Sequence, residues 1–135
     1  MISRRSILLT LTAATLSGGI LPALARPRRT NPIRMFDTDN DGTLDLAEVK
    51  KAASALFAKL DRDHGGTLDK RELAGRLSAK ELAAADPDHD GTLTADEYLA
   101  VVEQRFNAAN PDKDGTLDAK ELNTAAGLAL LRLMR

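Results

Sequence analysis

The chain has 135 residues, enough for one domain, and its 20 acidic residues nearly balance its 19 basic residues. The absence of cysteine excludes disulfides, thiolate zinc sites and cysteine nucleophiles. Aromatic residues make up 3% of the chain and no basic face emerges, which argues against a nucleic-acid partner and favours small helices over a sheet.

The first 25 residues have the pattern of a cleaved signal peptide. Arg4 and Arg5 precede an apolar run over residues 7–20, and residues 23–25 (ALA) form a small-x-small cleavage site. A transmembrane anchor is the alternative, but the run is short and is broken by Thr, Ser and Gly. The stretch SRRSILL also resembles a twin-arginine export signal, and the pattern leaves both the twin-arginine and the general secretory routes open. We expect a mature protein in the periplasm, with no membrane attachment after cleavage.

Residues 26–35 are charged and broken by proline, which predicts a flexible leader and not a nucleic-acid-binding arm. Residues 36–135 contain four similar twelve-residue segments, at 37–48, 61–72, 86–97 and 110–121. All but two of the 20 Asp and Glu residues lie in these segments. Clustered carboxylates repel each other, so such clusters usually exist to bind a cation.

The four segments share the pattern of an EF-hand loop. A hard cation binds six to eight oxygens, which carboxylates at alternate positions, the carbonyl of position 7 and both oxygens of a glutamate at position 12 can supply. Glycine at position 6 permits the sharp turn. The predicted ligands are Asp37, Asp39, Asp41, Thr43, Asp45 and Glu48 in loop 1; Asp61, Asp63, Thr67, Asp69 and Glu72 in loop 2; Asp86, Asp88, Asp90, Thr92, Thr94 and Glu97 in loop 3; and Asn110, Asp112, Asp114, Thr116, Asp118 and Glu121 in loop 4.

A solvated turn would explain one such loop, because Asp and Gly are common in turns, but it does not explain four complete copies. Leucine occupies position 8 of every loop, and we predict that it points inward and pairs two loops through a short β bridge. Both histidines, His64 and His89, occupy position 4, which provides no ligand. We interpret them as solvated side chains and not as a transition-metal site.

The loops begin only 24 or 25 residues apart, so 12 or 13 residues separate one loop from the next. That interval holds one helix of about 18 Å, which must serve both neighbouring loops. We predict helices over 49–60 and 98–109, and a middle connector that breaks and restarts at a capping box of Ser78 and Glu81. The apolar positions expected in the core are Val49, Ala52, Ala53, Leu56, Leu60, Leu99, Val102, Phe106, Leu128, Leu131 and Leu133.

The predicted fold is therefore all-α: a compact small helical EF-hand bundle in which short shared helices join four metal loops. A shared helix holds consecutive loops near its opposite ends, which makes simple pairing of neighbouring loops doubtful. The spacing leaves open which loops pair.

These features resemble the lanmodulins, periplasmic lanthanide-binding EF-hand proteins of methylotrophic bacteria. The resemblance covers about residues 36–135 and rests on the short loop spacing, on Pro87 and Pro111 at loop position 2, on Asn110, and on the segment EYLAVVEQRFNAANPD. It implies that the chain prefers trivalent lanthanides to calcium and becomes ordered on binding them. Four residues depart from the family pattern: Thr38 and Arg62 replace proline, Gly65 replaces a ligand, and Thr94 replaces an acid.

The sequence thus predicts an exported metal carrier, buffer or sensor that takes lanthanide(III) ions and/or Ca²⁺ and has no enzymatic activity. Each added carboxylate favours a trivalent ion more, because Coulomb attraction scales with ion charge. Loop 1, with five carboxylates, is expected among the strongest sites, and loop 2, with Gly65, the weakest. The alternatives are a periplasmic calcium-binding protein and a calcium-dependent interaction module of the dockerin kind. Dockerins generally carry two loops with Asp at position 12, whereas this chain has four loops with Glu there, which argues against the interaction module. The sequence does not indicate a protein partner.

Overall fold

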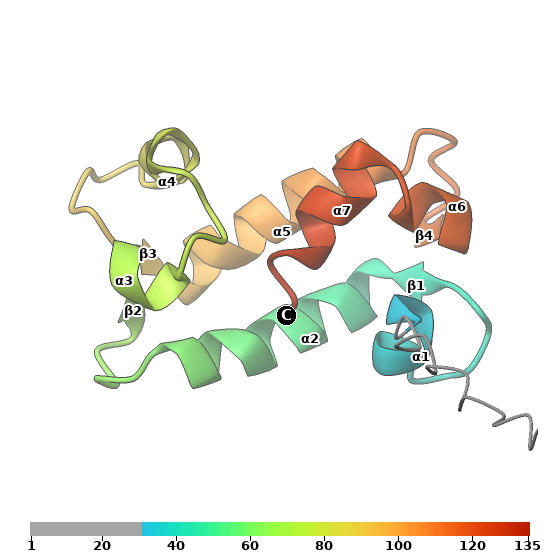
Figure 1. The fold of residues 1–135 in the computed structure, drawn as a ribbon, viewed down its shortest axis with the longest axis horizontal. Helices are drawn as coiled ribbons and strands as arrows, with labels where there is room; N and C mark the ends of the chain where they lie inside the picture. Colours follow the sequence, from blue (N-terminus) through green and yellow to red (C-terminus); the bar gives the residue numbers. More distant parts are fainter. Residues whose placement is uncertain (1–30) are drawn as a thin grey trace, which may run out of the picture.

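The computed structural model describes residues 31–135; the predicted signal peptide and most of the predicted leader lie outside the described residues. Two helices of 15 residues each, α2 (Leu46–Leu60) and α5 (Ala95–Ala109), pack against each other along the length of the molecule (Figure 1). The shorter helices are α1 (Pro32–Phe36), α3 (Lys70–Leu73), α4 (Ala79–Ala85), α6 (Ala119–Leu122) and α7 (Ala125–Leu131). The prediction of an all-α EF-hand fold with helices shared between loops is confirmed.

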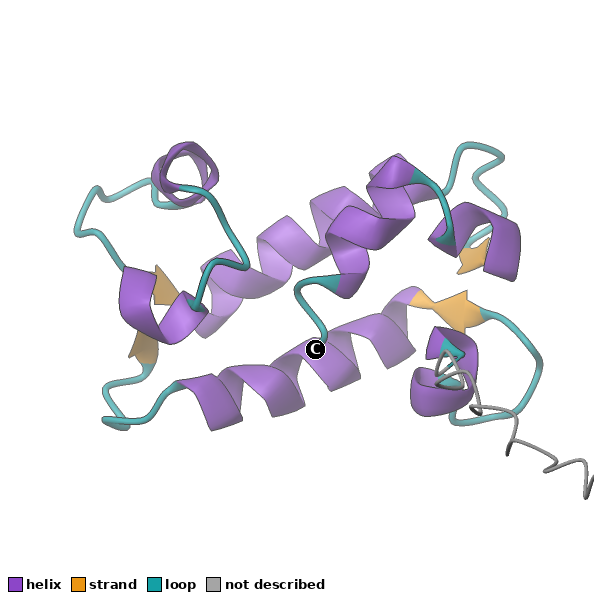
Figure 2. Ribbon diagram, viewed as in Figure 1, coloured by secondary structure: helices purple, strands orange, loops and turns teal. Residues whose placement is uncertain are grey.

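Four two-residue strands join the loops in pairs at the two ends of the molecule (Figure 2). Strand β1 (Leu44–Asp45) pairs antiparallel with β4 (Thr116–Leu117), and β2 (Thr67–Leu68) pairs antiparallel with β3 (Leu93–Thr94). Loop 1 therefore lies beside loop 4, and loop 2 lies beside loop 3. We call these the 1/4 end and the 2/3 end.

The leucines at position 8 form the centre of each pair. Leu44 is the register partner of Leu117, and Leu68 is the partner of Leu93. All four side chains are fully buried. The predicted inward-facing leucine bridge is confirmed, and the pairing that the spacing left open is 1 with 4 and 2 with 3.

The middle connector is broken, as predicted, and the break allows loops 2 and 3 to pair. Helix α3 ends in a left-handed turn at Ala74 and Gly75, with φ of 47° and 78°. Helix α4 then begins after its N-cap Ser78, whose hydroxyl accepts the N–H of Glu81 while the carboxylate of Glu81 accepts the N–H of Ser78. By contrast, α2 and α5 are unbroken, so the two loops that each one joins stand at opposite ends.

The core lies between α2, α5, α7 and the C-terminal residues. Phe57 on α2 contacts Tyr98 on α5, with ring centroids 5.7 Å apart and planes tilted by 59°. The hydroxyl of Tyr98 donates to the carbonyl of Leu133 at 2.7 Å. Burial raises the pKa of Tyr98 to about 12. Tyr98 directly follows Glu97, the last residue of loop 3, so the end of loop 3 is attached directly to a buried core residue.

Two expected core positions are wrong. On α2 the buried residue of the last turns is Phe57. Leu56 is partly buried and does not pack against the core, whereas the partly buried Ala52, Leu60 and Leu99 do. In the C-terminal segment Leu131 and Leu133 are buried as expected, but the side chain of Leu128 is 51% exposed. Period alone does not distinguish adjacent apolar residues on a helix; the position of the neighbouring helix does.

The described domain begins before residue 36. Helix α1 is capped by Asn31, whose side chain accepts the N–H of Ile33, and Ile33 is buried in the core. Residues 32–35 of the predicted leader therefore lie in helix α1. Among the helices of residues 31–135, none combines the length and the apolar character needed to cross a bilayer.

Candidate metal centre

Three of the four loops bring a trio of carboxylates together. In each trio the side chains come from loop positions 1, 3 and 12, and their oxygens lie within 4.8 Å of one another. The trios are Asp37, Asp39 and Glu48 in loop 1; Asp61, Asp63 and Glu72 in loop 2; and Asp86, Asp88 and Glu97 in loop 3. Three converging carboxylates at this separation offer the oxygen ligands that hard cations require.

The turn that shapes these loops is held by position 1. The N–H of the position 6 glycine donates to the position 1 carboxylate at 3.0 Å from Gly42 to Asp37, and at 2.8 Å from Gly91 to Asp86. Gly66 donates to the equivalent carboxylate of loop 2 at 3.0 Å. The four position 6 glycines have φ between 79° and 90°, a conformation that disfavours other residues.

Position 4 also takes a left-handed backbone in every loop. Its residues are Asn40, His64, His89 and Lys113, with φ near 60°. All four side chains are exposed, and the histidines belong to none of the carboxylate trios. This placement agrees with our interpretation of the histidines as solvated side chains.

The acidic residues at position 5 lie outside the trios. The carboxylate of Asp41 accepts both the N–H and the hydroxyl of Thr43, at 2.8 and 2.7 Å. Asp90 and Asp114 make the same pair of bonds to the threonines two residues later. The hydroxyl of Thr43, followed by its N–H, lowers the pKa of Asp41. In loop 1 these bonds favour the ionised form of Asp41, beside the threonine whose carbonyl is the expected ligand.

Position 9 has a structural task that our sequence reasoning missed. Asp45, Asp69, Thr94 and Asp118 are the N-caps of the helices that leave the four loops. Each accepts the N–H of the position 12 glutamate and donates its own N–H to that glutamate, forming a capping box. The signal was present in the sequence as D-x-x-E or T-x-x-E at the end of each loop. The same box fixes one oxygen of every position 12 ligand.

In loops 1 and 3 the carboxylates of the trio disfavour one another's ionised form. At Asp39 the N–H of Asp41 lowers the pKa, but partial desolvation and the charges of Asp41 and Glu48 outweigh it, so the pKa is raised. In loop 3 the hydrogen bond that Asp88 shares with Asp86 raises the pKa of Asp88 and lowers that of Asp86. A cation between these groups would remove the repulsion, so the donor set fits a metal ion.

Loop 4 has a different residue at position 1. Asn110 stands at position 1 and is 6% exposed, and its Oδ1 is buried without a hydrogen-bond partner. An orphaned buried oxygen is costly, and a cation would satisfy it. Asp112, Asp114 and Glu121 belong to the same loop, but among the described residues they form no carboxylate trio. Loop 4 therefore fits an ion through an amide oxygen where the other loops use a carboxylate.

Loop 2 lacks one side-chain ligand. The N–H of Gly65 donates to both Asp61 and Asp63 at 2.9 Å. Desolvation raises the pKa of Asp61, but the N–H groups of Gly66 and Gly65 outweigh it and the pKa is lowered. The position 5 N–H donates to these carboxylates in loops 1 and 3 as well, so what loop 2 lacks is the position 5 side chain itself.

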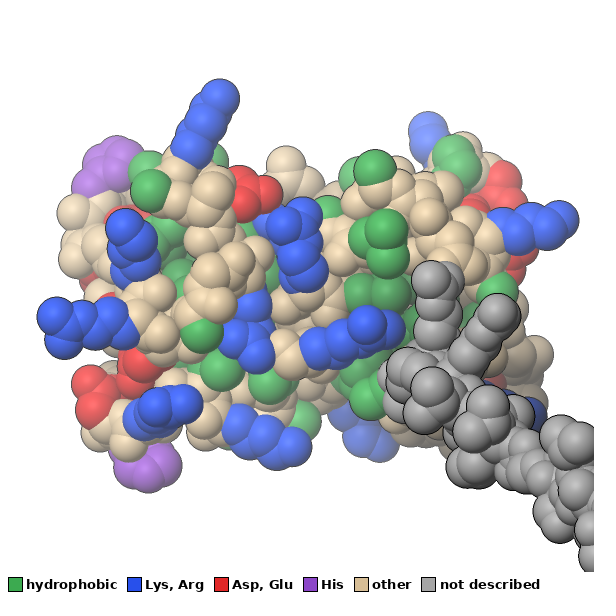
Figure 3. All heavy atoms as spheres, viewed as in Figure 1, with side chains coloured by type: hydrophobic (Ala, Val, Ile, Leu, Met, Phe, Trp, Pro, Cys, Tyr) green, Lys and Arg blue, Asp and Glu red, His purple; other side chains and the backbone are tan. Residues whose placement is uncertain are grey.

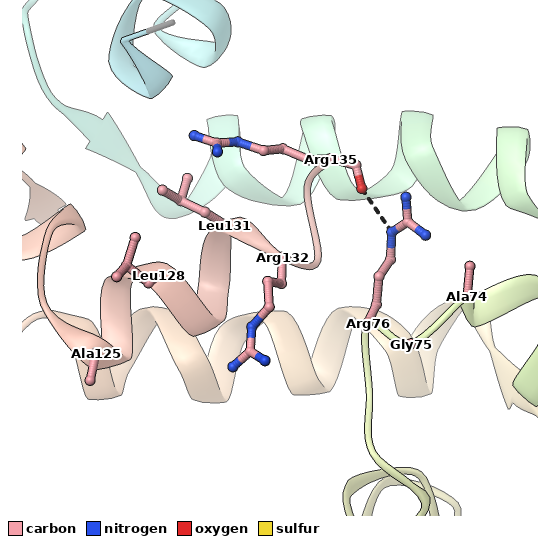
Figure 4. Close-up of a pocket in the computed structure, with 8 residues that line it drawn as sticks. All are labelled: Ala74, Gly75, Arg76, Ala125, Leu128, Leu131, Arg132 and Arg135. Atoms are coloured by element: carbon pink, nitrogen blue, oxygen red, sulfur yellow. Dashed lines mark hydrogen bonds between the residues drawn. The ribbon is translucent and has the colours of Figure 1, made fainter. Parts of the chain in front are cut away.

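The surface separates the charges. Acidic side chains gather mainly toward the two loop ends, whereas lysines and arginines cross the middle of the face shown in Figure 3. A hollow of about 730 Å³ on the middle of the molecule is lined by Arg76, Arg132 and Arg135 together with apolar residues (Figure 4). Its positive charge makes this hollow unsuitable for a cation, so the candidate metal centres are the four loops.

The loop architecture and the carboxylate trios define a metal-binding EF-hand protein. The EF-hand domain pair family matches residues 34–103, about half of the chain, and the chain belongs to the EF-hand family. The chain is also similar to lanmodulin from Methylorubrum extorquens, with 52% identity over 59 residues. That match covers 42% of this chain and 44% of the relative, so it spans less than half of either protein.

Proposed function

We propose that this protein is an exported lanthanide(III)-binding protein that gains helical structure on binding and acts as a metal carrier, buffer or sensor. The observation that carries the proposal is the convergence of carboxylates from positions 1, 3 and 12 in three loops. The similarity to lanmodulin supports the same conclusion, and the unpartnered buried oxygen of Asn110 supports a cation in loop 4. Calcium fits the same oxygen donors and is the weaker ligand in this proposal.

Metal binding is coupled to folding through the position 12 glutamates. Glu48 and Glu97 lie in the first turns of the long helices α2 and α5, while their partners in each trio lie before the turn. An ion bound by a trio therefore connects the segment that enters the loop to the helix that leaves it. Binding free energy then becomes folding free energy.

The charge of the loops favours a trivalent ion. In water a carboxylate at ~4 Å attracts a unit charge by roughly 1 kcal/mol, and the attraction grows with ion charge. The acids at position 9 of loops 1, 2 and 4 add negative charge without entering the trios. An exported protein meets more calcium than a cytosolic one, so a useful switch in that compartment must discriminate against calcium.

The deciding experiment is a side-by-side titration of helicity with La³⁺ and Ca²⁺, measured by far-UV circular dichroism. We expect La³⁺ to induce helix at a far lower free concentration than Ca²⁺. A triple variant with Asp45→Asn, Asp69→Asn and Asp118→Asn should bring the La³⁺ and Ca²⁺ midpoints closer together. Asparagine caps helices as well as aspartate does, so the variant removes charge and retains the caps. Equal midpoints in the unaltered protein would refute the lanthanide proposal and leave a periplasmic calcium-binding protein.

Export is tested separately. The proposal expects a protein whose first residue is Arg26, as read by mass spectrometry of a periplasmic fraction. A variant with Arg4→Lys and Arg5→Lys should remain in the cytoplasm if the route requires twin arginines. Unchanged export of this variant would assign the general secretory route. An uncleaved protein in the cytoplasm would refute export.

A further inference from the structure

In all four loops one carboxylate oxygen of the position 12 glutamate, Oε2, accepts the same hydrogen bond, but the bonds to the other oxygen, Oε1, differ between loops. In every loop Oε2 accepts the N–H of position 9, at 2.8 to 3.1 Å. In loop 1, Oε1 of Glu48 also accepts the N–H of Thr38 at 2.6 Å and its hydroxyl at 3.0 Å. In loop 2, Oε1 of Glu72 accepts the N–H of Arg62 at 3.0 Å.

Loops 3 and 4 cannot make the second bond. Their position 2 residues are Pro87 and Pro111, and proline has no backbone N–H. Within residues 31–135, no hydrogen bond reaches Oε1 of Glu97 or Glu121. The difference therefore follows from residue type at position 2 and not from a difference in the capping boxes.

A bond between positions 2 and 12 closes the loop. These positions stand at opposite ends of the loop, ten residues apart in loops 1 and 2. The N–H therefore ties the entering segment to the exiting helix without an ion. In loop 2 the bond leaves Oε1 of Glu72 one lone pair for metal, because each carboxylate oxygen has two. In loop 1 the rotatable hydroxyl of Thr38 occupies the second lone pair of Oε1 of Glu48 and would turn away when an ion binds.

We propose that the backbone N–H groups of Thr38 and Arg62 are positioning groups, which hold Glu48 and Glu72 in the ligand geometry before an ion arrives. Loops 1 and 2 are then closed by the protein, and loops 3 and 4 are closed by the ion. The inference rests on metal binding at the four loops, as proposed above.

The loop pairing gives this difference a consequence. Loop 1 pairs with loop 4 and loop 2 with loop 3, so each end of the molecule contains one tied loop and one proline loop. Here a tied loop is one closed by the position 2 N–H, loop 1 or loop 2, and a proline loop is one with proline at position 2, loop 3 or loop 4. The tied loop provides a formed strand, β1 or β2, against which the proline loop closes when it binds its ion. Each end therefore has a scaffold loop and a metal-dependent loop.

The first test measures the bond in the metal-free protein. Pro111→Ala introduces an amide opposite Glu121, and its hydrogen exchange is read by NMR in EDTA, with and without Glu121→Ala. A hydrogen bond should slow exchange at position 111 roughly three- to tenfold while Glu121 is present, since a net bond of this kind contributes ~0.5–1.5 kcal/mol. Equal exchange in the single and double variants would overturn the proposal, because backbone flexibility alone does not depend on Glu121.

The second test remains decisive if the metal-free protein is too unfolded for exchange measurements. Arg62→Pro deletes the N–H, and Arg62→Ala is its matched control, which removes the same charge and retains the N–H. We expect Arg62→Pro to raise the midpoint of the weakest binding step three- to tenfold over Arg62→Ala. An effect of proline through stiffness would leave that midpoint unchanged or lower it, and either result would overturn the proposal.

Titrations with La³⁺ and with Ca²⁺ distinguish a failure of this inference from a failure of the proposed function. The tie acts whichever ion binds, so Arg62→Pro should shift the La³⁺ and Ca²⁺ midpoints by the same factor relative to Arg62→Ala. The proposed function is judged from the ratio of the two midpoints in the unaltered protein. A shift for one ion alone would overturn the tie as we describe it, while leaving that ratio untouched.

Discussion

The two ends of the molecule are built from the same loops but are closed by different routes. At the 2/3 end the paired strands β2 and β3 are neighbours in sequence and the broken connector brings them together. At the 1/4 end, β1 and β4 come from nearly opposite ends of the domain. Loop-length scaling makes closure of the longer segment about 1 kcal/mol more costly. The 1/4 end therefore depends on the packing of α2, α5 and α7, whereas the 2/3 end forms more locally.

The end that is harder to close has the loop with the most candidate carboxylate ligands. The 1/4 end contains loop 1, with carboxylates at positions 1, 3, 5, 9 and 12, and loop 4, with the orphaned oxygen of Asn110. The 2/3 end contains loop 2, which lacks a position 5 ligand. The end that is harder to close thus has the richer first loop, and the end that closes locally has the poorest loop. Metal should matter most where the chain alone is least able to close.

Metal removal should have the largest effect and should expose this difference. In EDTA we expect loss of helicity across the molecule, because the trios repel and helices of 15 residues or fewer are marginal alone. Amides of β1 and β4 should exchange faster than those of β2 and β3. Hydrogen exchange with NMR detection measures both. A far-UV spectrum that metal does not change would contradict the coupling, and equal exchange at the two ends would contradict the comparison.

Truncating one leucine at each end should give the next largest effect. Leu44→Ala and Leu68→Ala each remove a fully buried side chain from a loop bridge, so each should cost ~2–5 kcal/mol. We expect the larger loss for Leu44→Ala, because the 1/4 end has less local support. Urea unfolding of the metal-saturated protein measures the cost. Leu128→Ala is the control at an exposed site and should change stability by less than ~0.5 kcal/mol.

Restoring the missing ligand should have a moderate effect confined to the 2/3 end. Gly65→Asp should strengthen the weakest binding step by about tenfold, which corresponds to ~1.4 kcal/mol. A Cβ at this position would lie 2.9 Å from the carboxylate of Asp63, which is exposed and can move. Gly65→Ala adds the Cβ without the ligand and serves as the control. An unchanged weakest step in a metal titration would show that loop 2 is not the limiting site.

The smallest effect is expected for an ion pair between the long helices α2 and α5, which connect the two ends. Lys50 on α2 and Glu103 on α5 form an ion pair at 2.6 Å, with both side chains more than a third exposed. Exposed pairs contribute ~0–1 kcal/mol, and added salt screens them. Glu103→Gln should therefore change the free energy of unfolding by less than ~1 kcal/mol and should affect both ends equally. A larger loss, or a loss at one end only, would show that α2 and α5 do not support the two ends in common.

Much of the candidate site could be predicted because its causes are local. The turn at Gly42 requires a positive φ, and the break before α4 requires a capping residue such as Ser78; both requirements act over a few residues. Inward-facing leucines follow from the alternation of side chains in a strand. The four capping boxes at position 9 were equally local and were missed because we interpreted the position 9 residues only as ligands and as added charge.

What the sequence by itself determined is the set of candidate ligand residues, the position of each turn and the length of each connector, because these depend on neighbouring residues. Only the tertiary structure decided that loop 1 lies beside loop 4, that Phe57 and not Leu56 meets Tyr98, and that Leu128 stays exposed. Each of these outcomes depends on how α2 packs against α5 and α7. That packing joins residues far apart in the chain, and helical period and loop spacing carry no information about which distant surfaces meet.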